Sequence, residues 1–146
     1  MNRGSVTTAI AALAFAAAAA VPAAAETPNL VGTWKAVAGE GVVARFGVAT
    51  EHNAAAAAPE IVPPSDQAWT LVIEKQEGRA FTGHGMSPKG AKQPFVGVVR
   101  RDDEGVIIAD AEGELTGEYD DGKLDLCWTD DRPGRAVVSC WLFARQ

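Results

Sequence analysis

The feature that most constrains the fold is a tight turn near the end of the chain, Pro133-Gly134, between two segments of alternating polarity. Proline presets the first central position of a type I or II turn, and glycine accepts the positive φ that a type II turn needs next. Antiparallel pairing outward from this turn places Cys127 opposite Cys140. Opposed Cα atoms in such a ladder lie about 4.5 to 5.5 Å apart, within reach of a disulfide. The sequence predicts a hairpin with a disulfide; the alternative is two unpaired, buried thiols.

The same pairing sorts the side chains of this hairpin onto two faces, because opposite residues of an antiparallel pair share a face. Both cysteines fall on a polar face together with Asp125 and Thr129. We therefore expect the disulfide on the outside of the fold. The other face is apolar and lines the predicted core: Leu124, Leu126, Trp128, Val137, Trp141 and Phe143.

Residues 1–25 have the pattern of an export signal. Arg3 gives a positive start, residues 8–21 form an alanine-rich apolar core, and Ala23-Ala24-Ala25 offers a small-residue cleavage site. We expect cleavage after Ala25 and a periplasmic or secreted location, where a disulfide persists. The apolar core is shorter than the roughly 20 residues of a membrane span, so we expect no span in the mature chain.

The remaining residues, 26–146, have the size of one domain. The chain has a formal net charge of −6, and loss of Arg3 with the export signal makes the mature domain more negative by one unit. Such a charge disfavours nucleic acid and anionic lipid as partners. The partners we expect are a small apolar ligand or another envelope or secreted protein.

Short alternating segments separated by turn residues predict an all-β domain, because no stretch shows helical periodicity. Successive hairpins indicate an antiparallel up-and-down meander of 8–9 strands. Pairing of the first strand with the last would close it into a small barrel without exposed edges; an open β-sandwich is the alternative. The expected strands are Leu30 to Val37, Gly41 to Ala49, Gln67 to Glu74, Arg79 to His84, Pro94 to Arg100, Gly105 to Ala109, Gly113 to Tyr119, Lys123 to Thr129 and Ala136 to Ala144.

Two further turns predict which residues lie opposite each other in the hairpins that they connect. Asp121-Gly122 is a strong two-residue hairpin signal, which sets Tyr119 opposite Leu124. The segment 76–78 fits a three-residue loop, which would set Ile73 opposite Phe81.

The long connection 51–66 breaks this rhythm. It is too rich in proline for a strand, and a short helix over residues 53–58 could cap one barrel end. Such a connection is either a functional lid or tolerated disorder.

Gly32-Thr33-Trp34 opens the first expected strand, and Arg145 closes the last. This pair resembles the signature of the calycin superfamily, which includes lipocalins and avidins. The resemblance implies a closed barrel in which Gly32, Trp34 and Arg145 are structural and the guanidinium lies over the indole. The residues that hold biotin in avidins do not map onto this chain in order, so biotin binding is not implied.

A second resemblance covers more of the chain, from Leu30 through the segments 69–73, 87–90 and 117–119 to the last strand. These segments are similar to the small accessory β domain that precedes some bacterial secreted serine hydrolases. The start Leu30-Val31-Gly32-Thr33-Trp34 also resembles that of small disulfide-bearing β-barrel inhibitors of bacterial secreted proteases. Those inhibitors use an N-terminal arm, and only residues 26–29 would precede the barrel here.

The side chains favour binding over catalysis. His52 and His84 are the only histidines, no segment resembles a nucleophile elbow, and the acidic groups lack the spacing of a calcium loop. We therefore expect no enzyme activity, no metal and no cofactor.

Inward aromatic residues could surround an apolar ligand at the barrel mouth, or they could simply fill the interior of a protein-interaction or protease-inhibitor domain. The candidate ligand-binding residues are Trp34, Trp69, Tyr119, Trp128, Ser139 and Trp141.

Overall fold

The computed structural model describes residues 26–48, 55–62 and 69–146, so the expected export signal lies outside the described residues. The described part contains ten β-strands and no helix. No helix there could cross a membrane. The strands are β1 (Gly32–Ala36), β2 (Val42–Gly47), β3 (Ala56–Val62), β4 (Thr70–Glu77), β5 (Ala80–Met86), β6 (Lys92–Val99), β7 (Gly105–Ala109), β8 (Glu114–Asp120), β9 (Lys123–Asp130) and β10 (Arg135–Arg145).

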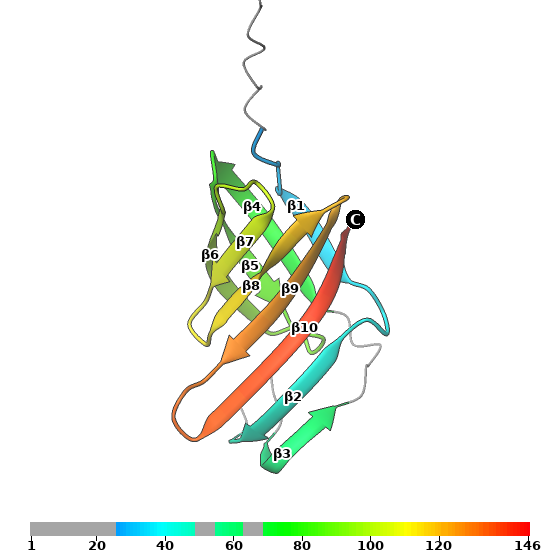
Figure 1. The fold of residues 1–146 in the computed structure, drawn as a ribbon, viewed down its shortest axis with the longest axis vertical. Helices are drawn as coiled ribbons and strands as arrows, with labels where there is room; N and C mark the ends of the chain where they lie inside the picture. Colours follow the sequence, from blue (N-terminus) through cyan, green and yellow to red (C-terminus); the bar gives the residue numbers. More distant parts are fainter. Residues whose placement is uncertain (1–25, 49–54, 63–68) are drawn as a thin grey trace, which may run out of the picture.

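Eight of these strands, β1 and β4 to β10, form a closed antiparallel barrel (Figure 1). Neighbours along the ring are β1-β4-β5-β6-β7-β8-β9-β10, and β1 pairs with β10 to close it. Trp34 of β1 lies opposite Arg145 of β10. The predicted all-β meander and its closure by the first and last strands are thus confirmed.

The second expected strand is not part of this ring. β2 pairs with the first half of β10, and β1 pairs with the second half, so both lie along the same edge of that long strand. Figure 1 shows β2 and β3 as an antiparallel pair beyond the ring. The physical reason is the length of β10, whose eleven residues provide a pairing edge for two strands in succession.

The prediction that the proline-rich connection contains no strand is wrong, because Ala56–Val62 forms β3. Pro59 lies within this strand, and β3 is the last strand in the sheet order of the described residues. Proline is compatible with an edge strand because only one side of such a strand must supply ladder hydrogen bonds. The rest of the expected connection, 51–54 and 63–66, lies outside the described residues, as do residues 53 and 54 of the proposed helix.

The turns set the register as predicted in two hairpins. Tyr119 lies opposite Leu124 across Asp121-Gly122, and Trp128 lies opposite Ser139 across the 131–134 turn. The predicted pairing of Ile73 with Phe81 is wrong, since Ile73 pairs with Gly83.

An irregularity between Ile73 and Lys75 accounts for that difference. It adds a residue to β4, and Glu77 then pairs with Ala80 across a tighter turn. Because the bulge restores the alternation, Ile73 and Phe81 both still face the core, with at most 2% of either residue exposed.

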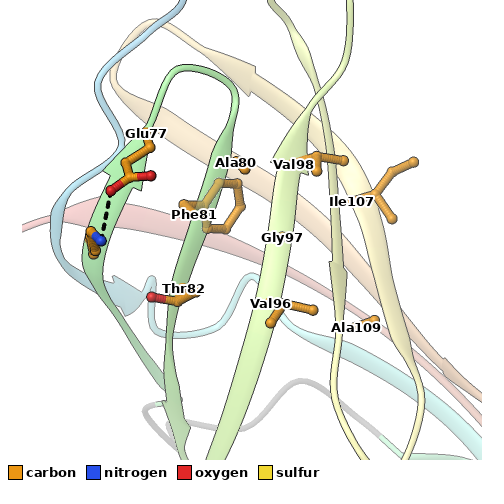
Figure 2. Close-up of a pocket in the computed structure, with 10 residues that line it drawn as sticks. Glu77, Ala80, Phe81, Thr82, Val96, Gly97, Val98, Ile107 and Ala109 are labelled. Carbon is orange, nitrogen blue, oxygen red and sulfur yellow. Dashed lines mark ion pairs between the residues drawn. The ribbon is translucent and has the colours of Figure 1, made fainter.

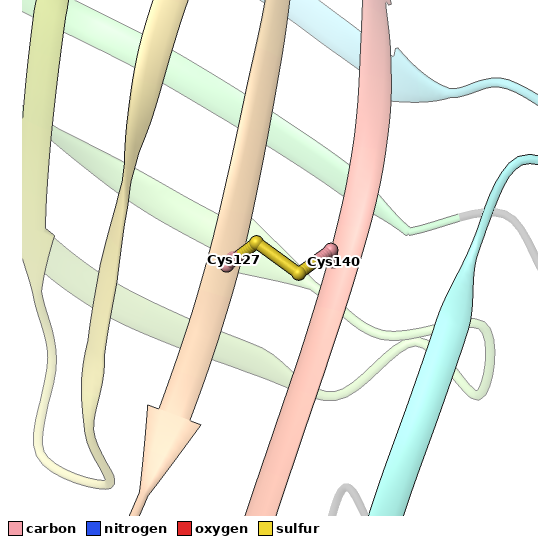
Figure 3. Close-up of a disulfide and its surroundings, with 2 residues drawn as sticks. All are labelled: Cys127 and Cys140. Carbon is pink, nitrogen blue, oxygen red and sulfur yellow. A yellow bond between two sulfur atoms is a disulfide. The ribbon is translucent and has the colours of Figure 1, made fainter. Parts of the chain in front are cut away.

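Cys127 and Cys140 form the predicted disulfide between β9 and β10 (Figure 3). They are paired residues of the ladder, and the next pair, Leu126 with Trp141, faces inward. Since successive residues of a strand face opposite sides, the disulfide lies on the outer surface of the barrel.

One end of the barrel is sealed by the segment before β1. Leu30 is fully buried there, and its backbone N–H donates to the side-chain oxygen of Gln76 at 2.8 Å. The Gln76 amide donates in turn to the Pro28 carbonyl at 2.9 Å, and the Trp34 indole N–H donates to the Leu30 carbonyl at 2.8 Å. We call this the closed end and the opposite one, which carries the β7–β8 and β9–β10 turns, the open mouth.

Candidate functional site

The interior of the barrel is filled by side chains over most of its length. Trp34, Ile73, Val106, Ile108 and Leu126 each have at most 1% of their surface exposed. A cavity of about 80 Å³ lies at the open mouth, among the residues that the structure describes. Its lining residues come from both the ring and β2: Val43, Trp69, Leu71, Gly85, Gln93, Phe95, Asp110, Glu112, Leu115, Trp128, Ser139, Trp141 and Phe143.

Strand register explains why aromatic rings gather at this cavity. Trp128 faces inward from β9 opposite Ser139 of β10 and Leu115 of β8. Trp141 lies two residues beyond Ser139 and therefore on the same face. Because Ser139 is small, its pairing with Trp128 leaves space that a larger side chain at position 139 would fill.

Two glycines shape the cavity. A Cβ at Gly41 would lie 2.0 Å from the Trp141 ring, so only glycine lets that indole rest against the chain between β1 and β2. Gly85 faces the cavity from β5, and a Cβ there would have ordinary contacts, the nearest being Leu71 Cδ2 at 3.7 Å. The missing methyl group of Gly85 is therefore part of the open space.

The rim of the cavity carries two carboxylates, Asp110 and Glu112, on the turn between β7 and β8. Asp110 Oδ1 accepts the backbone N–H groups of Glu112 at 2.7 Å and of Gly113 at 2.8 Å. This hydrogen-bonded turn fixes the Asp110 carboxylate at the mouth. Gln93 and Ser139 add neutral polar side chains to the lining.

An ionic cluster lies beside the cavity. Arg132 donates from Nε and Nη2 to the buried carboxylate of Asp130, at 2.9 and 2.7 Å. Arg135 Nε lies 2.9 Å from Asp130 Oδ2 as an ion pair, without hydrogen-bond geometry. The hydrogen bonds from Arg132, with the nearby charge of Arg135, hold the pKa of Asp130 below its usual value despite burial, and Asp130 raises the pKa of Arg132. Arg132 Nη2 also lies 3.7 Å from Glu112 Oε1, which connects the cluster to the rim.

Four of the six candidate ligand-binding residues meet at this cavity: Trp69, Trp128, Ser139 and Trp141. Trp34 and Tyr119 do not line it. They pack edge to face with ring centroids 6.1 Å apart, and Trp34 contacts the closed-end seal. The structure therefore separates these two aromatics from the other four residues.

The expected residue set omitted several groups that line the mouth. Alternation within Pro94 to Arg100 could have identified Phe95 as inward-facing. Asp110 and Glu112 sit on a turn that lies two hairpins before the 131–134 turn, and alternate turns of a meander lie at the same barrel end. Counting the hairpin turns along the chain would therefore have placed both carboxylates at the same barrel end as the 131–134 turn, which is the mouth.

A second hollow lies on the outside of the barrel (Figure 2). It measures about 470 Å³ and is open to solvent along β4 to β7, with the Lys75–Glu77 ion pair at its border, 2.7 Å between Nζ and Oε1. Val96 and Val98 are 61% and 44% exposed there. The polar residues of this hollow are Lys75, Glu77 and Thr82, and the rest of its lining is apolar or glycine.

The described residues contain no cluster of three or more His, Cys, Asp or Glu arranged to hold a metal ion. Comparison of the chain with family models, curated proteins and solved structures gives no significant match.

Proposed function

We propose that this protein is an exported, calycin-like binding module that holds a small apolar or amphipathic group at the open mouth of its barrel. The observation that carries the proposal is the mouth cavity, an apolar space with a few convergent polar groups, which is the usual character of a ligand site. Gly41 and Gly85 support the proposal, because each keeps the cavity in its present shape.

The size of the cavity limits what it can hold. Sites for drug-sized ligands measure about 300 to 1,000 Å³, and this one measures about 80 Å³. A buried water needs about 10 to 15 Å³ by the corresponding measure. The bound part is therefore a compact group of a few heavy atoms, and a fatty-acyl chain does not fit within the barrel.

Titration with 3,3-dimethyl-1-butanol, a compact amphipathic probe, tests the proposal. In ¹⁵N–¹H NMR spectra the indole signals of Trp69, Trp128 and Trp141 should shift with saturation. The Trp34 indole is the internal control, because it lies in the closed-end core. If all four indole signals remain unchanged up to the solubility limit of this probe and of charged analogues of the same shape, the mouth is not a binding site.

A protein-interaction or protease-inhibitor domain is the second candidate. It is favoured by the apolar outer face of β2, β3 and β10, where Val42, Phe46, Ile61 and Val138 are each at least 45% exposed. Monomeric proteins seldom expose large contiguous apolar patches without a binding role. Assays against subtilisin and trypsin test the inhibitor function. Inhibition by the wild type that is lost in Phe46→Ser would support it, and full protease activity at excess protein would refute it.

A further inference from the structure

We propose that the group held in the mouth cavity is a methylated ammonium, such as a trimethylammonium head group. This inference rests on the proposed binding function and adds the chemical class of the ligand. Five aromatic side chains line the cavity, from Trp69, Trp128, Trp141, Phe95 and Phe143, out of four tryptophans, five phenylalanines and one tyrosine in the whole chain. Aromatic faces carry negative electrostatic potential and attract organic cations.

The charged residues that line the cavity are negative, which favours a cationic ligand. Asp110 and Glu112 are the charged residues of the lining, and both are acidic. The adjoining cluster adds the carboxylate of Asp130 and the guanidinium groups of Arg132 and Arg135. Among the residues that the structure describes, three carboxylates thus accompany two guanidinium groups, so the described side chains here carry a net negative charge. An anionic ligand would be repelled by the rim.

The size and polarity of the cavity favour a methylated cation over other cations. A primary ammonium is strongly hydrated, and its burial requires several hydrogen-bond acceptors. Methyl groups remove those N–H donors and spread the charge over a surface that packs against rings. A volume of about 80 Å³ suits such a compact head group, and the rest of the ligand then lies outside this cavity.

Choline and 3,3-dimethyl-1-butanol test the proposal because they have the same shape and differ in charge. We expect choline to bind the wild type at least tenfold more tightly than the alcohol. Asp110→Asn/Glu112→Gln should reduce choline affinity at least fivefold and leave affinity for the alcohol unchanged. The asparagine side chain at position 110 retains the oxygen that accepts the two backbone N–H groups. Glu114→Gln is the matched control, since Glu114 is exposed on β8 and does not line the cavity.

The outcomes separate this inference from the proposed function. Equal or tighter binding of the alcohol would overturn the cation assignment and leave a neutral binding site. Failure of both probes to shift any indole signal would overturn the inference and the binding function together. If choline binds as expected, cosedimentation with phosphatidylcholine vesicles that free choline inhibits assigns the group to a lipid head. Choline binding without vesicle binding assigns it to a free small molecule.

Discussion

The guanidinium carbon of Arg145 lies 4.5 Å from the centroid of the Trp34 ring. These residues face each other across the β1–β10 pair that closes the barrel. Arg145 Nη2 also donates to the backbone carbonyl of Asn29, next to the buried Leu30. One arginine therefore connects ring closure to the seal of the closed end.

Replacement of this arginine should weaken the fold. Arg145→Ala removes the cation–π contact and a hydrogen bond, and we expect the free energy of unfolding to fall by about 1 to 2 kcal/mol. Arg145→Lys keeps a cation over the ring and should lose less. Urea denaturation measures both, with Arg101→Ala on an exposed turn as the control. Equal stability of Arg145→Ala and Arg101→Ala would contradict the structural role of the contact.

The disulfide should support the barrel without contributing to the mouth. It joins residues thirteen positions apart on the outer face. In Cys127→Ser/Cys140→Ser we expect a loss of roughly 2 to 3 kcal/mol of stability, or less if the hairpin persists in the unfolded chain. Affinity for choline and for 3,3-dimethyl-1-butanol should not change. A folded double variant that no longer binds a ligand of the wild type would show that the bridge shapes the cavity.

A methyl group at Gly41 should disturb the cavity through Trp141. The added Cβ would lie 2.0 to 2.5 Å from ring atoms of that indole, so the ring must move. We expect Gly41→Ala to shift the Trp141 indole NMR signal and to reduce probe affinity at least fivefold. The Trp34 signal should stay in place. An unmoved Trp141 signal would contradict the close packing of this glycine.

The Asp130 cluster predicts a pH-dependent contribution to stability. The hydrogen bonds from Arg132 hold the pKa of Asp130 below its usual 3.8 in the folded protein. The ionised carboxylate therefore stabilises the fold at pH above about 4, and this contribution is lost as the pH falls through the lower, folded-state pKa. Thermal unfolding of the wild type and Asp130→Asn between pH 7 and 2 measures it. The wild type should be more stable near pH 7, and the difference should shrink in acid; a difference that stays constant would contradict the assignment.

Turn chemistry made much of the barrel predictable from sequence. Asp121-Gly122 and Pro133-Gly134 each determine a register locally, and the two registers agree about the buried face. Closure followed from the general cost of exposed strand edges. Hairpin register depends on neighbouring residues, and barrel closure follows from a rule that applies to all sheets. Register and closure can therefore both be inferred from a single sequence.

The features that escaped prediction depend on contacts between distant segments. The bulge after Ile73 lies where the pairing of β4 with β1 ends and its pairing with β5 continues. Strand β3 exists because β2 offers it an edge, which outweighs the low strand propensity of alanine and Pro59. Alternation identified inward-facing tryptophans, but the barrel end at which each one lies follows only from the full strand order. The sequence therefore made Trp34 and Trp128 equally good candidates for ligand binding. In the structure, Trp128 lines the mouth cavity and Trp34 lies at the closed end.

The most direct test of a ligand site at the mouth is a comparison of the wild type with Gly85→Ala. The new methyl group fits without a clash and occupies part of the cavity. Replacement of a strand glycine by alanine should leave stability unchanged or raise it by about 0.5 to 1 kcal/mol. We expect choline and 3,3-dimethyl-1-butanol to shift the Trp69, Trp128 and Trp141 indole signals of the wild type, and the affinity for both to fall at least fivefold in the variant. Undiminished binding by Gly85→Ala would show that the ligand binds elsewhere and that the mouth cavity is not the binding site.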